Sequence, residues 1–128
     1  MRIAHVALWV NDLEAMRSFY ATHFGGRAGA KYTNAAKGFE SYFLSFEGGA
    51  RLEIMRRTDV AGAARPAGEV PGWAHLAFSV GSTAAVDALT RRLEAAGLRR
   101  VDGPRRTGDG YYESVVLDPE GNRLEITV

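Results

Sequence analysis

The stretch that decides the fold is His5-Val6-Ala7-Leu8-Trp9-Val10, which returns at an offset of 70 residues as His75-Leu76-Ala77-Phe78-Ser79-Val80. The run Arg51-Leu52-Glu53-Ile54 likewise returns as Arg123-Leu124-Glu125-Ile126, at an offset of 72. Between these two pairs, Glu40-Ser41, Leu44 and Glu47-Gly48 match Glu113-Ser114, Leu117 and Glu120-Gly121, at an offset of 73. Three matches in the same order indicate an internal duplication, in which short insertions and deletions explain the drifting offset.

Both halves contain the same order of predicted elements. Each begins with an alternating strand, continues with a helix that ends at Gly, and finishes with three strand-like runs. In the first half these are residues 5–10, a helix from Asn11 or Asp12 to about Phe24, and runs at about 27–33, 39–46 and 51–57. In the second half they are 74–80, a helix at about 82–96, and runs near 98–105, 111–117 and 123–128.

The order of these elements predicts an α+β fold of two tandem βαβββ modules. The length of 128 residues fits a single domain, 1–128. Module 1 covers about 1–57 and module 2 about 73–128. The segment of about 58–72, which contains Gly, Ala and two Pro residues, is predicted to be the linker between them.

The composition excludes several classes of function. The net charge of +1 gives no reason to expect nucleic acid or a membrane surface as a partner. The absence of Cys excludes disulfides, thiolate metal sites and a Cys nucleophile. No run approaches the ~18 apolar residues of a membrane helix, and the first residues do not resemble a signal peptide. We therefore expect a cytoplasmic protein. Phosphate-loop and dinucleotide fingerprints are absent as well.

Four polar side chains occupy repeat-equivalent positions. Because side chains alternate across a strand, the aliphatic residues around His5 and Glu53 are expected to face the helix, while His5 and Glu53 face away from it. The same alternation applies to His75 and Glu125. Two imidazoles and two carboxylates suit a divalent ion such as Ni²⁺, Co²⁺ or Zn²⁺. The alternative is that the carboxylates simply face solvent and the imidazoles are hydrogen-bonded fillers.

At this point the sequence resembles the vicinal-oxygen-chelate superfamily, which includes glyoxalase I, bleomycin-resistance proteins, fosfomycin-resistance enzymes, extradiol dioxygenases and methylmalonyl-CoA epimerases. The resemblance covers essentially the whole chain. Its most specific marks are His5, His75 and the ending Asp118-Pro119-Glu120-Gly121-Asn122-Arg123-Leu124-Glu125. It implies that the two modules form a curved mixed sheet around a metal-binding groove.

Within that superfamily, the order His5–Glu53–His75–Glu125 looks like the metal-ligand set of bacterial glyoxalase I. The epimerases usually carry Gln at the position of Glu53. Fosfomycin-resistance enzymes and extradiol dioxygenases typically use three protein ligands, and bleomycin-binding members generally lack the set. Glu53 therefore favours glyoxalase I.

The resemblance implies a lyase or isomerase that converts the hemithioacetal of a 2-oxoaldehyde and a thiol into a 2-hydroxyacyl thioester, through an enediolate that the metal stabilises. By analogy Glu125 is the base and Glu53 its partner at the second carbon, although their symmetry leaves the two roles open. Members of this family commonly form dimers that assemble the groove across two chains, so we expect a homodimer, and the metal site lies either within one chain or across two.

One position departs from glyoxalase I. That family usually has an arginine four residues after the first ligand, where it meets a glutathione carboxylate, and this chain has Trp9. The substitution indicates an altered thiol or a substrate without a thiol; alternatively, Trp9 only packs at the groove edge. Trp9, Tyr42, Met55 and Tyr112 are the predicted substrate-binding residues of the groove wall.

Two further functions remain open. A small-molecule binding protein of bleomycin-resistance type would sequester its ligand in an aromatic groove, to which Trp9 and Tyr112 would contribute. Another metal-assisted enzyme of the same superfamily, such as an epimerase or a thiol transferase, would use the His and Glu residues on a different substrate.

Overall fold

The computed structural model describes residues 1–60, 62 and 71–128. The chain divides into two compact units, Met1–Ala63 and Ala64–Val128. Most of the predicted linker, residues 61 and 63–70, lies outside the described residues. In the described parts of the chain, no helix is long and apolar enough to cross a membrane.

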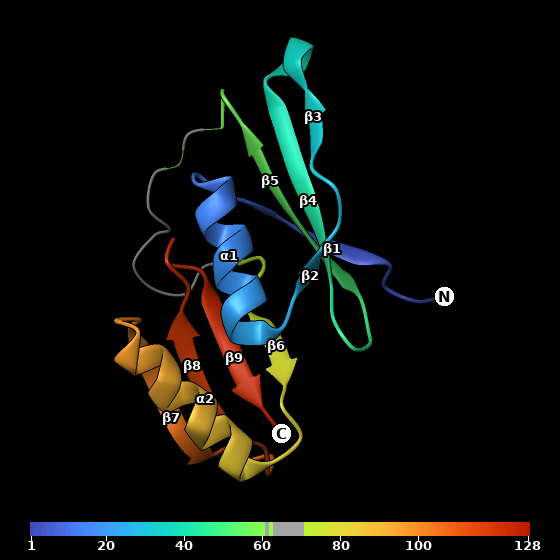
Figure 1. The fold of residues 1–128 in the computed structure, drawn as a ribbon. Helices are drawn as coiled ribbons and strands as arrows, with labels where there is room; N and C mark the ends of the chain where they lie inside the picture. The colour runs from blue at the N-terminus through green and yellow to red at the C-terminus, as the bar shows by residue number, and fades with distance from the viewer. Residues whose placement is uncertain (61, 63–70) are drawn as a thin grey trace. The chain divides into compact units, whose positions relative to one another are not determined.

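The N-terminal unit is a sheet with one helix across it (Figure 1). The strands follow the order β1-β5-β4-β2, and β3 pairs with β4. Strands β1 and β5 run parallel, whereas β4 pairs with its neighbours in the antiparallel direction. The elements are β1 His5–Trp9, α1 Leu13–Phe24, β2 Arg27–Ala28, β3 Tyr32–Asn34, the 3-10 turn Ala35–Lys37, β4 Phe39–Ser45 and β5 Arg51–Arg57.

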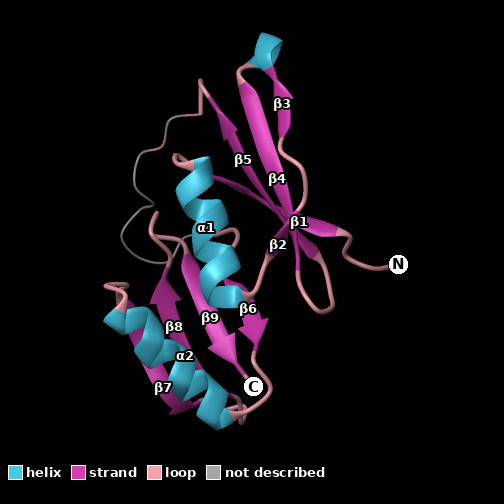
Figure 2. Ribbon diagram, in the orientation of Figure 1, coloured by secondary structure: helices cyan, strands magenta, loops and turns pink. Residues whose placement is uncertain are grey.

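The C-terminal unit repeats this arrangement, with strand order β6-β9-β8-β7. Strands β6 and β9 are parallel and the other pairs are antiparallel. Figure 2 shows α2 lying across the sheet of its own unit. The elements are β6 Leu76–Ser79, α2 Thr83–Ala95, β7 Arg100–Arg106, β8 Tyr112–Leu117 and β9 Arg123–Thr127. The predicted α+β fold of two βαβββ modules is confirmed.

Both helices begin at side-chain caps. Asp12 accepts a hydrogen bond from the backbone N–H of Ala15 (2.9 Å), and Ser82 does the same for Ala85 (3.2 Å). Helix α1 ends at Gly25, whose φ of 68° lies in the left-handed region. The helices bury an apolar stripe against the sheet, which forms the core of each unit. The most deeply buried side chains are Met16, Tyr20, Leu44 and Ile54 in one unit, and Val86, Leu93, Val116 and Ile126 in the other.

One predicted strand is wrong in its extent. The run at about 27–33 forms two short strands, β2 and β3, that both pair with β4. Between them, Gly29 keeps a single backbone hydrogen bond to the carbonyl of Phe43 (2.9 Å). The regular pairing with β4 stops after Ala28 and resumes at Tyr32. Gly29 begins this interruption and has no side chain to pack on the sheet.

The middle repeat match is also wrong as a structural equivalence. In β4, Ser41 lies opposite Met55, whereas in β8 Ser114 lies opposite Ile126. Strand β5 corresponds to β9 at an offset of 72, so Ile54 corresponds to Ile126. Tyr42 lies opposite Ile54 and Ser114 lies opposite Ile126, so Tyr42 is the structural counterpart of Ser114. An offset of 73 slips the strand by one residue, which exchanges its two faces.

Candidate metal centre

The first His–Glu pair lies on the sheet of the N-terminal unit. Ala7 of β1 is in register with Glu53 of β5, which brings the neighbouring His5 side chain to the same face. The His5 Nε2 atom lies 3.9 Å from Glu53 Oε2. Leu52 and Ile54, the neighbours of Glu53 along the strand, are buried on the opposite, helix-covered face. Alternation along β5 thus separates the core from the polar pair.

The C-terminal unit contains the same arrangement. Ala77 of β6 is in register with Glu125 of β9, and His75 Nε2 lies 3.2 Å from Glu125 Oε2. The imidazoles are 43% and 41% exposed, and the carboxylates of Glu53 and Glu125 are 15% and 17% exposed. Each pair is therefore held on its sheet with its imidazole open to a ligand.

The donors fit a divalent cation of borderline softness. Imidazole nitrogen suits Ni²⁺, Co²⁺ and Zn²⁺, and a carboxylate oxygen beside it supplies negative charge. Among the described residues, no group of three or more His, Asp or Glu side chains gathers in a way that could hold a metal ion. Each unit offers two of the four predicted donors.

Trp9 and Met55 extend the face that carries His5 and Glu53. They are in register on β1 and β5, and each is two residues further along its strand than Ala7 or Glu53. The Trp9 side chain remains 40% exposed. The structure therefore places both predicted wall residues on the polar pair's side of the sheet.

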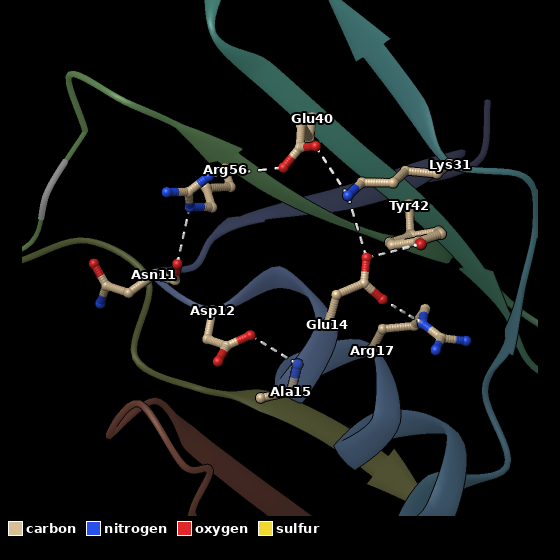
Figure 3. A network of polar contacts seen from close by, with 9 residues as sticks. All are labelled: Asn11, Asp12, Glu14, Ala15, Arg17, Lys31, Glu40, Tyr42 and Arg56. Atoms are coloured by element: carbon tan, nitrogen blue, oxygen red, sulfur yellow. Dashed lines mark hydrogen bonds and ion pairs between the residues drawn. The ribbon is translucent and has the colours of Figure 1, made fainter.

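The predictions for Tyr42 and Tyr112 are wrong, because both residues lie on the helix side. The Tyr42 hydroxyl donates to Glu14 Oε1 on α1 (3.0 Å), and burial together with this bond raises the pKa of Tyr42 (Figure 3). The Tyr112 hydroxyl donates to Asp87 Oδ1 on α2 (2.7 Å). Both phenols tie a strand to its helix, on the face opposite to Glu53 and Glu125.

Sequence reasoning missed two aromatic residues on β4. Phe43 is in register with Glu53, and its ring meets the His5 ring edge-on at 5.3 Å. Phe39, four residues before Phe43 on the same face of β4, lies edge-on to Trp9 with the ring centroids 6.1 Å apart. The signal that could have found them is Leu44: a buried aliphatic residue assigns the even positions of β4 to the core, and hence the odd positions to the His5 face.

The other face of β4 belongs to a polar network around α1 (Figure 3). Lys31 bridges Glu14 (3.2 Å) and Glu40 (2.9 Å), and Glu40 also pairs with Arg56 (3.7 Å). The hydrogen bond from Tyr42, followed by those from Lys31 and Arg17, lowers the pKa of Glu14. These carboxylates are occupied by neighbouring cations, so they are not candidates for the metal set.

Two further acids of the C-terminal unit are Asp118 and Glu113. Asp118 accepts hydrogen bonds from the backbone N–H groups of Glu120 (2.9 Å) and Asn122 (2.8 Å), which closes the turn that leads into β9. Glu113 lies on the same face of the sheet as Glu125. Burial raises the pKa of Glu113, and the negative charge of Glu125 raises it further. Asp118 therefore acts as a turn former, and Glu113 adds a second acid to the Glu125 face.

The arrangement of two such modules matches a known family. The model of the Glyoxalase/Bleomycin resistance protein/Dioxygenase superfamily matches residues 2–126. The chain belongs to this superfamily. The matched range covers both modules and contains all four residues of the two His–Glu pairs.

Several known proteins are similar to this chain over nearly its whole length. The uncharacterized protein PA2024 from Pseudomonas aeruginosa is 34% identical, over 98% of this chain and 86% of its own length. A glyoxalase family protein from Enterococcus faecalis is 27% identical, with a TM-score of 0.79 and coverage of 98% and 96%. A lactoylglutathione lyase from Agrobacterium tumefaciens is 26% identical, with a TM-score of 0.69 and coverage of 98% and 91%.

Proposed function

We propose that this protein is a metal-dependent lyase of the glyoxalase I type, which converts a 2-oxoaldehyde–thiol hemithioacetal into a 2-hydroxyacyl thioester. The observation that carries the proposal is the His–Glu pair built twice, by His5 with Glu53 (3.9 Å) and by His75 with Glu125 (3.2 Å). Two pairs supply four donors, whereas a binding protein has no need of either pair. Similarity to a lactoylglutathione lyase supports the same activity.

In this proposal residues 1–128 are one domain, and His5, Glu53, His75 and Glu125 are the protein ligands of Ni²⁺, Co²⁺ or Zn²⁺. The bound ion would supply an electrophile that orients the two substrate oxygens and stabilises negative charge on them. The four side chains have complementary roles: the imidazoles fix the site, and the carboxylates balance the charge of the cation. The protein is proposed to be cytoplasmic.

The carboxylates also carry the proton chemistry. Glu125 removes the proton from the carbon that bears sulfur, and a proton returns to the neighbouring carbon, so that the reaction is a balanced isomerisation. Glu53 is the proposed partner at that second carbon. The Glu53 and Glu125 side chains are only 15% and 17% exposed, which limits competing water and favours direct proton transfer to and from carbon. Trp9 and Met55 hold the remainder of the substrate.

The experiment combines metal content with methylglyoxal–glutathione isomerase activity on the same preparation. We expect stoichiometric metal, and we expect Glu53→Gln and Glu125→Gln each to lower kcat by at least about 100-fold, the lower range for loss of a general base. Glu47→Gln, in the exposed turn between β4 and β5, is the matched control and should retain activity. Bound metal without isomerase activity would contradict this substrate and favour another thiol, or an epimerase or thiol-transferase substrate.

A second candidate is a small-molecule binding protein. It is favoured by the exposed aromatic side chains of the N-terminal unit, Trp9 and Tyr32. Ligand binding that survives a chelator would support this function, and absence of metal after reconstitution would exclude the lyase. Either protein is proposed to be a homodimer; a sedimentation mass near that of one 13.9 kDa chain would contradict the dimer.

A further inference from the structure

An aromatic cluster lies on the His5–Glu53 face of the N-terminal unit. It consists of Trp9, Tyr32 and Phe39, from three different strands. The Phe39 ring lies 6.1 Å from the Trp9 ring and 6.0 Å from the Tyr32 ring. Trp9 is 40% exposed and Tyr32 is 56% exposed. Large aromatic side chains with this much exposed area gain free energy when a flat apolar group covers them.

Arg57, a cationic side chain at this cluster, already contacts Trp9 and Asp59. The Arg57 guanidinium lies over the Trp9 ring, 5.2 Å from its centroid, and its Nε–H donates to Asp59 Oδ1. The charge of Arg57 also lowers the pKa of Asp59, so the carboxylate is ionised at neutral pH and balances the guanidinium. The pair Arg57–Asp59 therefore gives the cluster a local net charge near zero. A ligand group rich in carboxylates would find little electrostatic gain here.

The cluster is continuous with the proposed metal ligands. Trp9 follows His5 by four residues on the same strand face, about 13 Å along β1. Ala7 lies between them and projects only a methyl group. Met55, next to Trp9 in the register, adds an adaptable apolar surface beside Glu53. A substrate that reaches from His5 to Trp9 would thus lie over the small, apolar side chain of Ala7 and beside Met55.

We propose that Trp9, Phe39 and Tyr32 form the subsite for an uncharged aromatic group of the substrate. This inference rests on the proposed function and specifies its substrate class: a hemithioacetal, or a related two-oxygen chelating compound, that carries an aryl group in place of the carboxylates of glutathione. The chelating oxygens would lie at His5 and Glu53, and the aryl group would stack on Trp9. Tyr32 and Phe39 close two sides of the subsite.

The test uses two chelating probes that differ only in a phenyl group, pentanohydroxamate and 5-phenylpentanohydroxamate. Calorimetry on the Zn²⁺-loaded full chain gives the affinity ratio of the two probes. We expect the phenyl probe to bind at least about 10-fold more tightly, as expected for one buried, stacked ring. In Trp9→Leu the ratio should fall to about 2 or less, with the affinity of pentanohydroxamate unchanged. Tyr111→Leu, which removes an exposed aromatic residue of the other unit, should keep the wild-type ratio.

A second readout does not require the Trp9 variant. The chain has two Trp residues, so in Trp73→Phe the intrinsic fluorescence reports Trp9 alone. The phenyl probe should quench or shift this emission, and pentanohydroxamate should not.

The possible failures are distinguishable. If pentanohydroxamate binds only with metal but the phenyl group adds no affinity, the subsite is wrong and the lyase proposal stands. If neither probe binds to metal-loaded protein, the proposed function fails as well. A sedimentation mass that halves in Trp9→Leu, with the probe ratio unchanged, would show that a second copy of the chain covers the cluster, which would overturn the inference.

Discussion

The Nε2 atom of His75 lies 3.2 Å from Oε2 of Glu125, and Glu125 is held in place by the parallel pairing of Ala77 with it. The equivalent distance in the other unit, from His5 to Glu53, is 3.9 Å. Two parallel strand pairs therefore place an imidazole nitrogen beside a carboxylate oxygen in the same way. The pair is set by backbone register, so a single substitution should remove one proposed ligand while the sheet remains.

We expect a divalent ion to stabilise the folded protein, because the unfolded chain has no preformed site. Zn²⁺ or Ni²⁺ at 100 times its Kd should raise the unfolding free energy by about 2.7 kcal/mol, and a chelator should reverse the gain. His5→Ala and His75→Ala should each lose most of the metal-induced rise in Tm. His23→Ala, on α1, should keep it; an equal loss in that variant, or no rise in the wild type, would contradict the ligand set.

The second prediction concerns a buried hydroxyl pair that joins α2 to β8. Thr90 Oγ1 lies 2.7 Å from the carbonyl of Val86 and 2.6 Å from Ser114 Oγ. Thr90→Val should cost about 1–3 kcal/mol, because the Ser114 hydroxyl then loses its side-chain partner in the core. Urea denaturation of Thr90→Val, Ser114→Ala and the double variant checks the coupling. The double variant should recover part of the loss, and strictly additive losses would refute the pair.

The third prediction is a pH dependence at Tyr112. The hydrogen bond to Asp87, together with burial, raises the pKa of Tyr112. A raised pKa means that the folded state binds this proton more tightly than the unfolded state does. The stabilisation is therefore complete below the unfolded value of about 10 and is lost as the pH rises through the folded value.

The corresponding experiment compares urea midpoints of the wild type and Tyr112→Phe. The wild type should be more stable at pH 8, and the difference should shrink above about pH 10. Tyr111→Phe, one residue earlier and exposed, is the control and should follow the wild type at both pH values. A difference in urea midpoint that does not change with pH would show that the hydroxyl stabilises the fold without a shift in its pKa.

The fourth prediction concerns Gly103 in β7. Its φ of +68° disfavours any side chain, and an added Cβ would come within 2.9 Å of Ser114 Cα and closer still to the Glu113 carbonyl. Gly103→Ala should therefore destabilise the protein by about 3 kcal/mol or more. Gly108→Ala is the matched control, since nothing lies within 4 Å of its added Cβ. Equal melting temperatures of the two variants would contradict this prediction.

The strands that carry His and Glu were predictable from the sequence. Leu52 and Ile54 flank Glu53 with buried aliphatic residues, and Leu124 and Ile126 do the same for Glu125, so alternation alone assigns the polar face. The caps at Asp12 and Ser82 were equally readable, because a side-chain acceptor before an apolar periodic run marks a helix start.

The middle strand could not be placed in the same way. The match of Glu40-Ser41 with Glu113-Ser114 is a true sequence similarity, but the residues lie on opposite faces. A register is fixed by hydrogen bonds to the neighbouring strand, and a slip of one residue leaves the local sequence unchanged. The sequence alone therefore does not show that Tyr42 faces the helix, or that Phe43 contacts His5.

The same register gives the two His–Glu pairs unlike surroundings. Phe43 packs beside His5, whereas its counterpart opposite Glu125 is Val115, with Glu113 further along the strand. The aromatic ring beside one pair and the extra acid on the face of the other make the two Glu side chains chemically different. A protein assembled from a duplicated module can therefore give its two carboxylates separate tasks.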